Sequence, residues 1–399
     1  MSRRSSARWS FARRRPWLAV GAVLACCACS SVPAGGAGNE TGIATRSGDS
    51  PSQDADVNGR PYTAPVLTAG SPVPLASKTW ADLGPALLTD GNGVLYAVNE
   101  EGTSAPELVT YKSVDGGRSW QVRGRLLSPV GLKGFVASKL VGPGATAGGL
   151  LLATVVINDN DGTVAQPCVW LTYVSRDQGQ SWAQGANASR PHACGYASGA
   201  LTVDDANGIH LFFSADGPGN QNQILQTVTT DGANSWSGHR LVVQADSNPR
   251  WPSGAHMGTA GSHRLLVAYE TEDAASGWKV DGVYSSDNGA SWSKASPLLQ
   301  PAAGEMYSAP NLMRLDERTL IVSYQHLYGS PENALANYID LASAPVPKSG
   351  LPSFASRQRL CVSECFPGWL AVAAPARLLV ATKRTQTDGT SLTPVDIER

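Results

Sequence analysis

The chain has 399 residues, with 31 basic and 32 acidic side chains and a formal net charge of −1. This balance excludes the strongly basic surface that nucleic-acid binding needs, so no nucleic-acid partner is expected. Charged residues make up only 16%, Gly (42) and Pro (26) are plentiful, and the apolar stretches are short and rich in β-branched and aromatic residues. The composition predicts an all-β folded body, and no motif indicates a cofactor.

Residues 1–29 are typical of an export signal. A basic segment is followed by an apolar run, Leu18 to Ala25, that is too short to span a bilayer comfortably. The end of that run, Val23-Leu24-Ala25-Cys26, resembles the lipobox of bacterial lipoproteins, which makes Cys26 a candidate lipidation site. Arg14-Arg15 also resembles a twin-arginine signal, so the export route stays open. We expect an exported protein, either a cell-surface lipoprotein or secreted, that touches the membrane only through an N-terminal lipid.

Residues 30–75 are rich in Gly, Ser, Ala, Asp and Pro and have almost no aromatic side chains. Such a segment buries too little apolar surface to fold, so it predicts a flexible tether. The folded domain is expected from residue 76 to residue 399.

One octamer occurs four times: SVDGGRSW (113–120), SRDQGQSW (175–182), TTDGANSW (229–236) and SSDNGASW (285–292). The interval between copies is about fifty to sixty residues, which is typical of propeller blades. Asp followed by Gly with flanking Ser is turn chemistry, because the carboxylate accepts hydrogen bonds from amides of its own loop. The Trp that ends each octamer is expected to cover the hairpin. We therefore interpret these residues as structural and not catalytic: Asp115, Trp120, Asp177, Trp182, Asp231, Trp236, Asp287 and Trp292.

A fainter repeat marks the first strand of each blade. An aromatic residue followed by small residues begins FVASKL (135), YASGAL (196), WPSGAH (251) and YSAPNL (307), and DLGPAL (82) and CFPGWL (365) are looser copies. A turn and an apolar second strand follow each copy. Six copies predict a six-bladed β-propeller. The last blade is short of strands, so residues around Tyr62 to Lys78 are expected to complete it and close the ring.

Together, the octamers and these blade openings resemble the sialidase (neuraminidase) superfamily of Asp-box, or BNR-repeat, propellers. The resemblance covers about Asp82 to Arg384. It implies a clamp of three arginines for a substrate carboxylate, an acid, and a Tyr nucleophile assisted by a Glu. The first-blade arginine position holds Leu83, and the equivalent positions of the other blades hold no arginine either. The sequence therefore predicts a divergent member with an incomplete sialidase site.

Starts of first strands and ends of second strands meet at one side of a propeller, which defines a candidate site. The candidate catalytic residues are Glu305, Tyr307 and Glu270. Candidate ligand-binding residues are aromatic, amide and basic groups that suit a sugar: Tyr196, Arg250, Trp251, Gln325, His326, Trp369 and Arg384. The alternative is that these side chains only fill the centre of the ring and pack between blades.

Four of the seven cysteines lie in the folded part, and an exported protein can form disulfides. Proximity in sequence favours the pairs Cys168–Cys194 and Cys361–Cys365 among the three possible pairings. The spacings fit no zinc motif, and Asn158-Asp159-Asn160-Asp161-Gly162 lacks the Glu of a calcium loop. No metal site is expected.

The sequence leaves three hypotheses for function. The leading one is an exported sialidase-like propeller, expected to be a monomer, that recognises carbohydrate or another extracellular ligand. The alternative is an active glycoside hydrolase, either an atypical exo-α-sialidase or another exo-glycosidase. The third is a scaffold for protein interactions.

Overall fold

The computed structural model describes residues 56, 58–76, 85–89, 93–101, 107–127, 135–141, 151–158, 168–188, 199–216, 222–244, 248–258, 261–273, 277–330, 333–361, 370–374, 376–383 and 390–398. The chain divides into two units, residues 1–50 and 51–399, and all described residues belong to the second. Every element of this part is a β-strand. Accordingly, the described residues include no helix that could cross a membrane.

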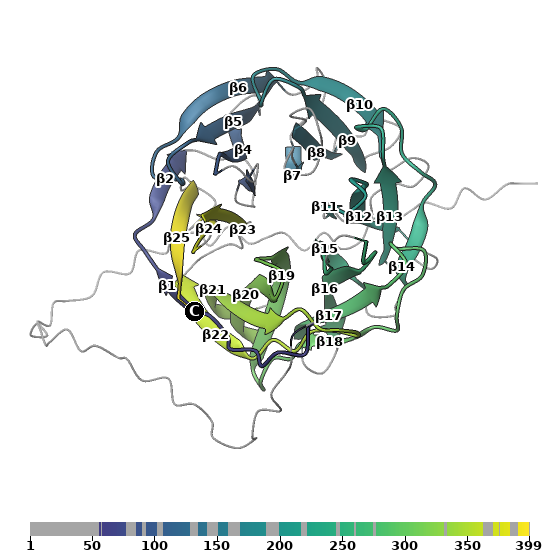
Figure 1. The fold of residues 1–399 in the computed structure, drawn as a ribbon, viewed down its shortest axis with the longest axis vertical. Coiled ribbons are helices and arrows are strands. Elements are labelled where there is room, and N and C mark those ends of the chain that lie inside the picture. Colours follow the sequence, from purple (N-terminus) through teal and green to yellow (C-terminus); the bar gives the residue numbers. More distant parts are fainter. Residues whose placement is uncertain are drawn as a thin grey trace, which may run out of the picture. The chain divides into compact units, whose positions relative to one another are not determined.

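Five regular blades, each an antiparallel sheet of four strands in chain order, follow one another around an axis (Figure 1). Blade one contains β3 (Ala86–Thr89), β4 (Leu95–Glu101), β5 (Glu107–Ser113) and β6 (Gln121–Leu127). Blade two contains β7 (Phe135–Val141), β8 (Leu151–Asn158), β9 (Cys168–Ser175) and β10 (Ala183–Asn187). Blade three contains β11 (Gly199–Val203), β12 (Ile209–Asp216), β13 (Asn222–Thr229) and β14 (Arg240–Gln244).

Blades four and five carry the longest strands. Blade four contains β15 (Arg250–His256), β16 (Leu265–Asp273), β17 (Gly277–Ser285) and β18 (Ser296–Leu299). Blade five contains β19 (Glu305–Arg314), β20 (Thr319–Ser330), β21 (Asn333–Pro345) and β22 (Ser356–Cys361). The apolar runs predicted as second strands are β4, β8, β12, β16, β20 and β24, so that prediction is confirmed.

A sixth sheet, here called the closing sheet, joins the two ends of the folded unit. It contains β23 (Leu370–Ala374), β24 (Arg377–Lys383), β25 (Thr390–Glu398), β1 (Val66–Ala69) and β2 (Val73–Ala76). Both N-terminal strands pair antiparallel with β25. The prediction that residues near Tyr62 to Lys78 complete the last sheet is confirmed. The predicted tether of residues 30–75 is therefore too long, because β1 and most of β2 lie within it.

The described residues thus form an all-β propeller, and the fold class predicted from the sequence is confirmed at that level. The predicted count of six blades is wrong: the described residues form five regular four-stranded blades, and the sixth sheet is irregular and has five strands. The closing sheet differs from a regular blade because its outer edge is built from two short strands that both pair with β25.

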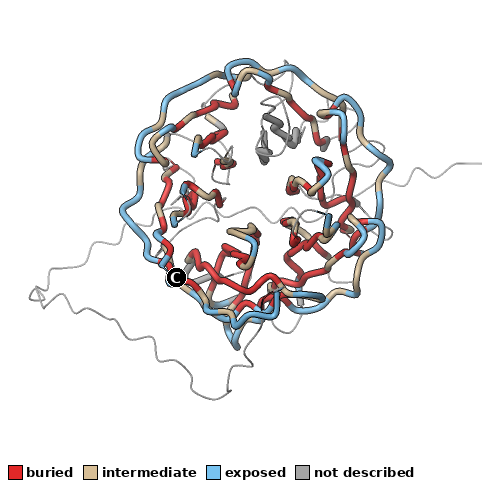
Figure 2. The backbone as a smooth tube through the Cα atoms, viewed as in Figure 1, coloured by how far each residue is buried: buried red, intermediate tan, exposed pale blue. Residues whose placement is uncertain are grey.

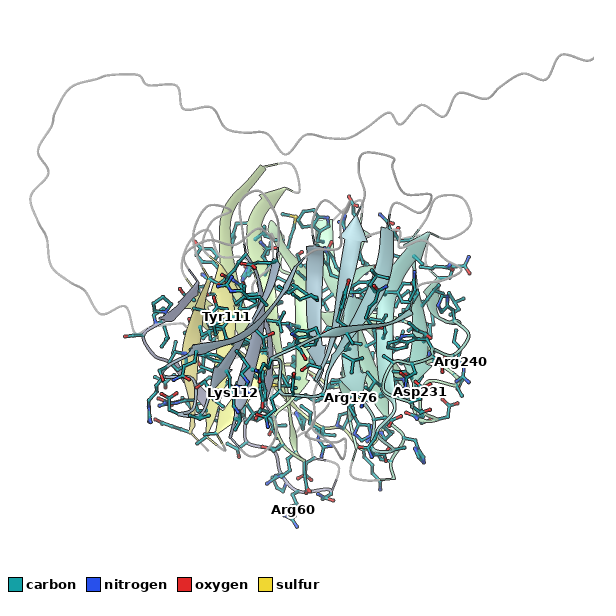
Figure 3. All side chains as sticks on the ribbon, turned by 90° about the horizontal axis from the view of Figure 1, so that it is seen from above. Arg60, Tyr111, Lys112, Arg176, Asp231 and Arg240 are labelled. Atoms are coloured by element: carbon teal, nitrogen blue, oxygen red, sulfur yellow. The ribbon has the colours of Figure 1, made fainter. Side chains whose placement is uncertain are left out.

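The antiparallel order of the strands assigns each loop to one of two ends. Each octamer lies between the third and fourth strands of its blade, so all four lie at the same end, which we call the octamer end. Starts of first strands and ends of second strands lie at the opposite end. Figure 3 shows the ring from the side, with the octamer residues Arg176 and Asp231 in its lower half.

The four octamers adopt one hydrogen-bonded turn. In the first, Asp115 Oδ1 accepts from the Ser113 hydroxyl (2.8 Å) and the Ser119 amide (3.0 Å), and Oδ2 accepts from the Ser119 hydroxyl (2.6 Å). The corresponding Asp of each other copy accepts the same three bonds. These bonds lower the pKa of Asp177 and of Asp287 to about 2. The predicted turn chemistry of the octamer is confirmed.

The octamer tryptophans connect neighbouring sheets, which extends the prediction that they cover a single hairpin. Trp120 packs in a cluster shared with the closing sheet, and Trp182 in one shared with blade one. Trp236 and Trp292 pack against clusters shared with blades two and three. Burial is concentrated in the inner and middle strands, and the outermost strands are mostly exposed (Figure 2). The octamers therefore stabilise the contacts between sheets of the ring.

Candidate functional site

The first strands of blades four and five are both irregular: the shift in β15 lies at its start, at the end opposite the octamers, and the shift in β19 lies near its middle. The pairing register shifts between Arg250 and Ser253 in β15, and between Ser308 and Asn311 in β19. Within the shifts, Trp251 has a φ of 52° and Ala309 a φ of 45°. A bulky side chain at positive φ is strained, and bulges that redirect a side chain are frequent beside binding sites.

Glu270, in the second half of β16, contacts both of these irregular strands. Its side chain is 1% exposed and accepts hydrogen bonds from Arg250 Nε and the Ser308 hydroxyl, and from the Ala309 amide at 3.3 Å. Burial raises the pKa of Glu270, although the charge of Arg250 and these hydrogen bonds oppose the shift. All its described contacts are internal, so a ligand does not reach this carboxyl group.

Glu305, at the start of β19, is the most accessible of the three candidate catalytic residues, with a side chain 20% exposed. Its Oε2 accepts hydrogen bonds from the Tyr307 hydroxyl (3.0 Å) and the Ala302 amide (3.3 Å), and lies 3.4 Å from His326 Nε2. Among the described residues, Oε1 has no hydrogen-bond partner. One oxygen of Glu305 is therefore held in place while the other can contact a ligand.

Tyr307 is fully buried. Burial raises its pKa to about 12, although the positive charge of Arg357 opposes the shift. Its hydroxyl donates to Glu305 and accepts from Arg357 Nη1 at 2.5 Å. A phenol that is enclosed and protonated in this way cannot attack a sugar in this conformation, so its geometry suits a residue that positions Glu305.

His326 and Asp340 continue the polar chain behind Glu305. His326 Nδ1 lies 2.6 Å from Asp340 Oδ2, and Arg359 Nε donates to Asp340 Oδ1 at 3.0 Å. Burial would raise the pKa of Asp340, but the hydrogen bonds from His326 and Arg359 outweigh it and lower the pKa. The His326 ring also stacks on Tyr328, with centroids 4.7 Å apart. The imidazole is thus fixed in orientation with Nε2 directed at Glu305.

Half-buried aromatic rings accompany the two carboxylates. The Arg250 guanidinium lies 5.2 Å from the centroid of Trp278, and that of Arg359 lies 4.0 Å from the centroid of Tyr338. Trp251 and Tyr328 are also only partly buried. Aromatic rings beside carboxylates and guanidinium groups offer the apolar faces and hydrogen-bonding groups that a saccharide requires.

The structure brings together most of the candidate residues that it describes. Glu305, Tyr307 and Glu270 lie on adjacent strands of blades four and five, and Arg250 and Trp251 begin β15. Gln325 and His326 are buried in β20, so neither meets a ligand directly in this conformation. Tyr196, Trp369, Arg384, Leu83, Cys26, Cys194 and Cys365 lie outside the described residues, and nothing is described of the side chains of Cys168 and Cys361.

Arg357 and Arg359 belong to this region although the sequence analysis did not select them. Both lie on β22, the outer strand of blade five, and reach over the face of the sheet to Tyr307 and Asp340. Their alternation along the strand, Ser-Arg-Gln-Arg-Leu, was the available signal, because residues two apart share one face. A pattern restricted to the starts of first strands does not include an outer strand such as β22.

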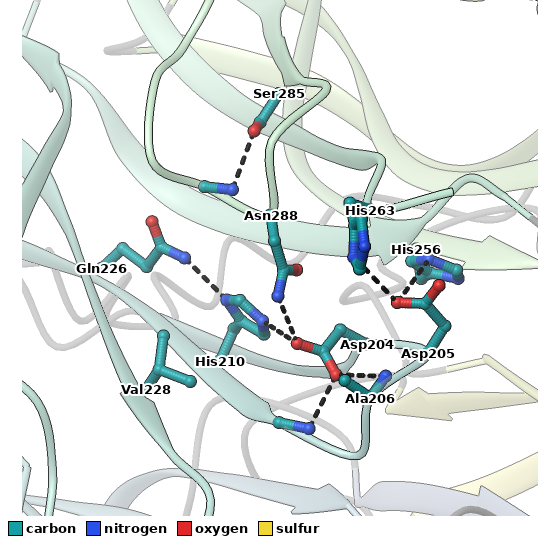
Figure 4. A network of polar contacts seen from close by, with 12 residues as sticks. Asp204, Asp205, Ala206, His210, Gln226, Val228, His256, His263, Ser285 and Asn288 are labelled. Carbon is teal, nitrogen blue, oxygen red and sulfur yellow. Dashed lines mark hydrogen bonds and ion pairs between the residues drawn. The ribbon is translucent and has the colours of Figure 1, made fainter. Parts of the chain in front are cut away.

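A second polar network lies at the octamer end, between blades three and four (Figure 4). Asp204 Oδ2 lies 2.9 Å from His210 Nε2 and accepts from Asn288 Nδ2 at 2.7 Å, and Gln226 Nε2 lies 2.6 Å from His210 Nδ1. Asp204 and His210 are buried and bonded internally. Across the described ranges, no group of His, Cys, Asp or Glu side chains is arranged to hold a metal ion. This network is a structural connection between blades.

The chain matches no protein-family model and no curated protein. Solved structures share its fold. A protein of unknown function from Dyadobacter fermentans aligns with a TM-score of 0.60 at 14% identity, over 83% of this chain and 99% of that one. An α-L-arabinanase from Penicillium chrysogenum complexed with arabinobiose aligns with a TM-score of 0.57 at 18% identity, over 82% of this chain and 98% of that one. A sialidase from Streptococcus pneumoniae aligns with a TM-score of 0.53 at 10% identity, over 83% of this chain and 70% of that one. These similarities establish the propeller fold.

Proposed function

We propose that this protein is an exported, sialidase-like propeller that recognises carbohydrate through the ends of blades four and five. The observation that carries the proposal is Glu305: it is accessible, fixed by internal hydrogen bonds through one oxygen, and accompanied by half-buried aromatic rings. Two of the structural neighbours are named for their action on sugars, and one contains a bound disaccharide. This supports a saccharide over other extracellular ligands.

Binding is favoured over hydrolysis by the state of the other two candidate catalytic residues. A retaining or inverting glycosidase normally needs two carboxyl groups that both reach the scissile bond. Glu270 is enclosed by Arg250, Ser308 and Ala309, and Tyr307 is fully buried. Of these three, only Glu305 is open to a ligand.

A glycan array probed with the purified protein tests the proposal. The wild type is expected to bind a defined set of glycans, and Glu305→Gln and Trp251→Ala are each expected to weaken that binding about tenfold or more, because a charge-assisted hydrogen bond and a stacking surface are lost. Glu317→Gln is the matched control, since Glu317 is an exposed acid of the same blade at the octamer end. Absence of any glycan binding would favour the scaffold hypothesis.

An active glycoside hydrolase remains the second candidate, and Glu305 is the observation in its favour. A panel of aryl glycosides, including a sialoside and an arabinofuranoside, separates this hypothesis from carbohydrate binding alone. Binding alone predicts no release of the aryl group above background. Turnover that Glu305→Gln abolishes would establish the hydrolase, and loss of turnover in Tyr307→Phe would show that the phenol becomes accessible during the reaction.

We further propose that the closing sheet serves as the sixth blade of the ring. Its strands β23, β24 and β25 follow the order of the first three strands of a regular blade, and β1 occupies the outer position. Pairing of an N-terminal strand with the last strand fastens the ring. Variants of β1 test this role of the closing sheet.

Attachment to the membrane through a lipid on Cys26 is proposed from the lipobox resemblance alone. Cys26→Ala should move the protein from the membrane fraction to the medium when it is expressed in a bacterium with lipoprotein processing. Cys27→Ala is the control. An unchanged distribution in Cys26→Ala would show that the protein is secreted without an anchor.

A further inference from the structure

Glu270 contacts two blades, with one carboxylate oxygen directed at each. Its Oε1 accepts from Arg250 Nε, within blade four, where Arg250 and Glu270 are direct partners in the pairing of β15 with β16. Its Oε2 accepts from the Ser308 hydroxyl and the Ala309 amide of β19, in blade five.

These partners flank the two irregular positions described above. Arg250 directly precedes Trp251, and Ala309 is itself the residue at positive φ in β19. Conformations of this kind cost free energy and persist only where surrounding contacts hold them. The hydrogen bonds of Glu270 supply such surrounding contacts on both sides of the boundary between blades four and five.

We infer that Glu270 is a positioning residue that fixes the spacing between Trp251 of blade four and Glu305 of blade five. The side chain is 1% exposed, so it acts through its neighbours and not on a ligand. Trp251 and Glu305 are the aromatic surface and the accessible carboxylate of the proposed carbohydrate site. The inference rests on the proposed function for the ligand, whereas the connection between the blades is independent of any ligand.

The contact of Glu270 with blade four and its contacts with blade five can be separated by substitution. Glu270→Gln keeps an amide oxygen that can accept from Ser308 and Ala309 but loses the charge that pairs with Arg250. Ser308→Ala removes one hydrogen bond on the blade-five side and leaves the Arg250 pair intact. Glu270→Ala removes the contacts with both blades. Glu272→Gln is the matched control, because Glu272 lies on the same strand, is exposed, and stands 3.7 Å from Arg250 Nη2.

Hydrogen exchange of the full chain, followed by mass spectrometry of peptides, tests the connection. In Glu270→Ala, exchange should accelerate about tenfold in peptides covering 250–256 and 305–312, because the lost hydrogen bonds protect those strand starts. The octamer peptide 113–120 should be unchanged. In Glu270→Gln, peptide 305–312 should recover its protection while 250–256 does not, and Ser308→Ala should show the reverse.

Acceleration spread evenly over all blades in Glu270→Ala would overturn the inference, because it indicates a general loss of stability. Unchanged exchange in both strand starts would also overturn it. A second measurement uses arabinobiose and a sialyl-lactose as probes: Glu270→Gln and Ser308→Ala should each weaken binding about tenfold, and Glu272→Gln should leave it unchanged. If neither probe nor any arrayed glycan binds the wild type, the proposed function fails, while the exchange experiment still decides the role of Glu270.

Discussion

The indole nitrogens of the octamer tryptophans are not equivalent, although the octamers share one turn. Trp182 Nε1 donates to the Thr110 hydroxyl of blade one at 3.0 Å, and Trp120 Nε1 donates to the Gly117 carbonyl of its own turn at 3.1 Å. The buried Nε1 atoms of Trp236 and Trp292 have no partner among the described residues. The same motif therefore makes a polar contact between blades at one boundary and an apolar one at others.

Replacement of these residues by Phe should separate the polar contribution from the apolar one. Trp182→Phe and Trp292→Phe lose the same ring area, but only the first breaks a hydrogen bond and leaves Thr110 without its donor. We expect Trp182→Phe to lower the free energy of unfolding by about 1 kcal/mol more than Trp292→Phe. Chemical denaturation of both variants measures the difference, and equal losses would show that the hydrogen bond adds nothing.

The Asp204 network predicts how stability depends on pH. Burial alone would raise the pKa of Asp204, but hydrogen bonds from His210, Asn288 and the Gly208 amide outweigh it and hold the pKa well below its ordinary value of 3.8. A carboxyl group with a depressed pKa in the folded state stabilises the fold above its unfolded-state pKa, and this contribution is lost as the pH falls.

Asp204→Asn should therefore have a lower Tm than the wild type near neutral pH. The difference should begin to shrink as the pH falls from about 5 to about 3, because the unfolded chain then binds a proton at Asp204 while the folded state stays ionised, and it should go on shrinking down to the lowered pKa of the folded state. Thermal unfolding of both proteins across this range is the measurement, with Glu317→Gln as an exposed control. A difference that stays constant down to about pH 3 would contradict the assignment.

At the scale of elements, the octamer turns dock on the preceding sheets at close range. A Cβ added to Gly124 in β6 would lie 2.3 Å from the carbonyl oxygen of Gly179, which belongs to the second octamer. A Cβ on Gly185 in β10 would meet Ala233 of the third octamer at 2.8 Å. Glycine in these outer strands allows backbone to approach backbone between neighbouring blades.

Gly124→Ala should therefore destabilise the fold by about 1–3 kcal/mol, because the neighbouring atoms are backbone and cannot move aside cheaply. Gly238→Ala is the matched control, since nothing lies within 4 Å of a Cβ placed there. That control should be neutral or more stable by up to about 1 kcal/mol. Similar unfolding midpoints for the two variants would refute close docking at Gly124.

The strands could be predicted from the sequence because the apolar runs and the octamer spacing are local patterns. Contacts between blades could not, because they depend on which faces of distant strands meet. Glu270 shows this limit: its place at a strand end suggested a catalytic acid, but Ser308, 38 residues away, encloses it. Arg357 shows it too, since its contact with Tyr307 spans 50 residues and the width of a sheet.

At the scale of the whole molecule, the proposed closure of the ring depends on β1, which pairs with β25. Leu67 is 6% exposed and packs in a cluster formed by the closing sheet and blade five, whereas its neighbour Val66 is 60% exposed. Leu67→Ala should lower the free energy of unfolding by about 2–3 kcal/mol. Val66→Ala should change it by less than about 0.5 kcal/mol. Calorimetry of the two variants tests the closure, and a small effect of Leu67→Ala would show that β1 is dispensable.

The polar contacts of Asp56, just before β1, have a mechanical consequence. The buried Asp56 carboxylate accepts from the amides of Asn58 (2.9 Å) and Arg60 (2.8 Å) and pairs with Arg318 in the turn between β19 and β20 of blade five. Arg318 also donates to the Pro61 carbonyl at 3.0 Å. Arg60 lies at the lower edge of Figure 3, on the side of the labelled octamer residues. A force applied to the chain from its N-terminal side would thus act first on the ion pair between Asp56 and Arg318. Blade five would carry that force before β1 could separate from β25.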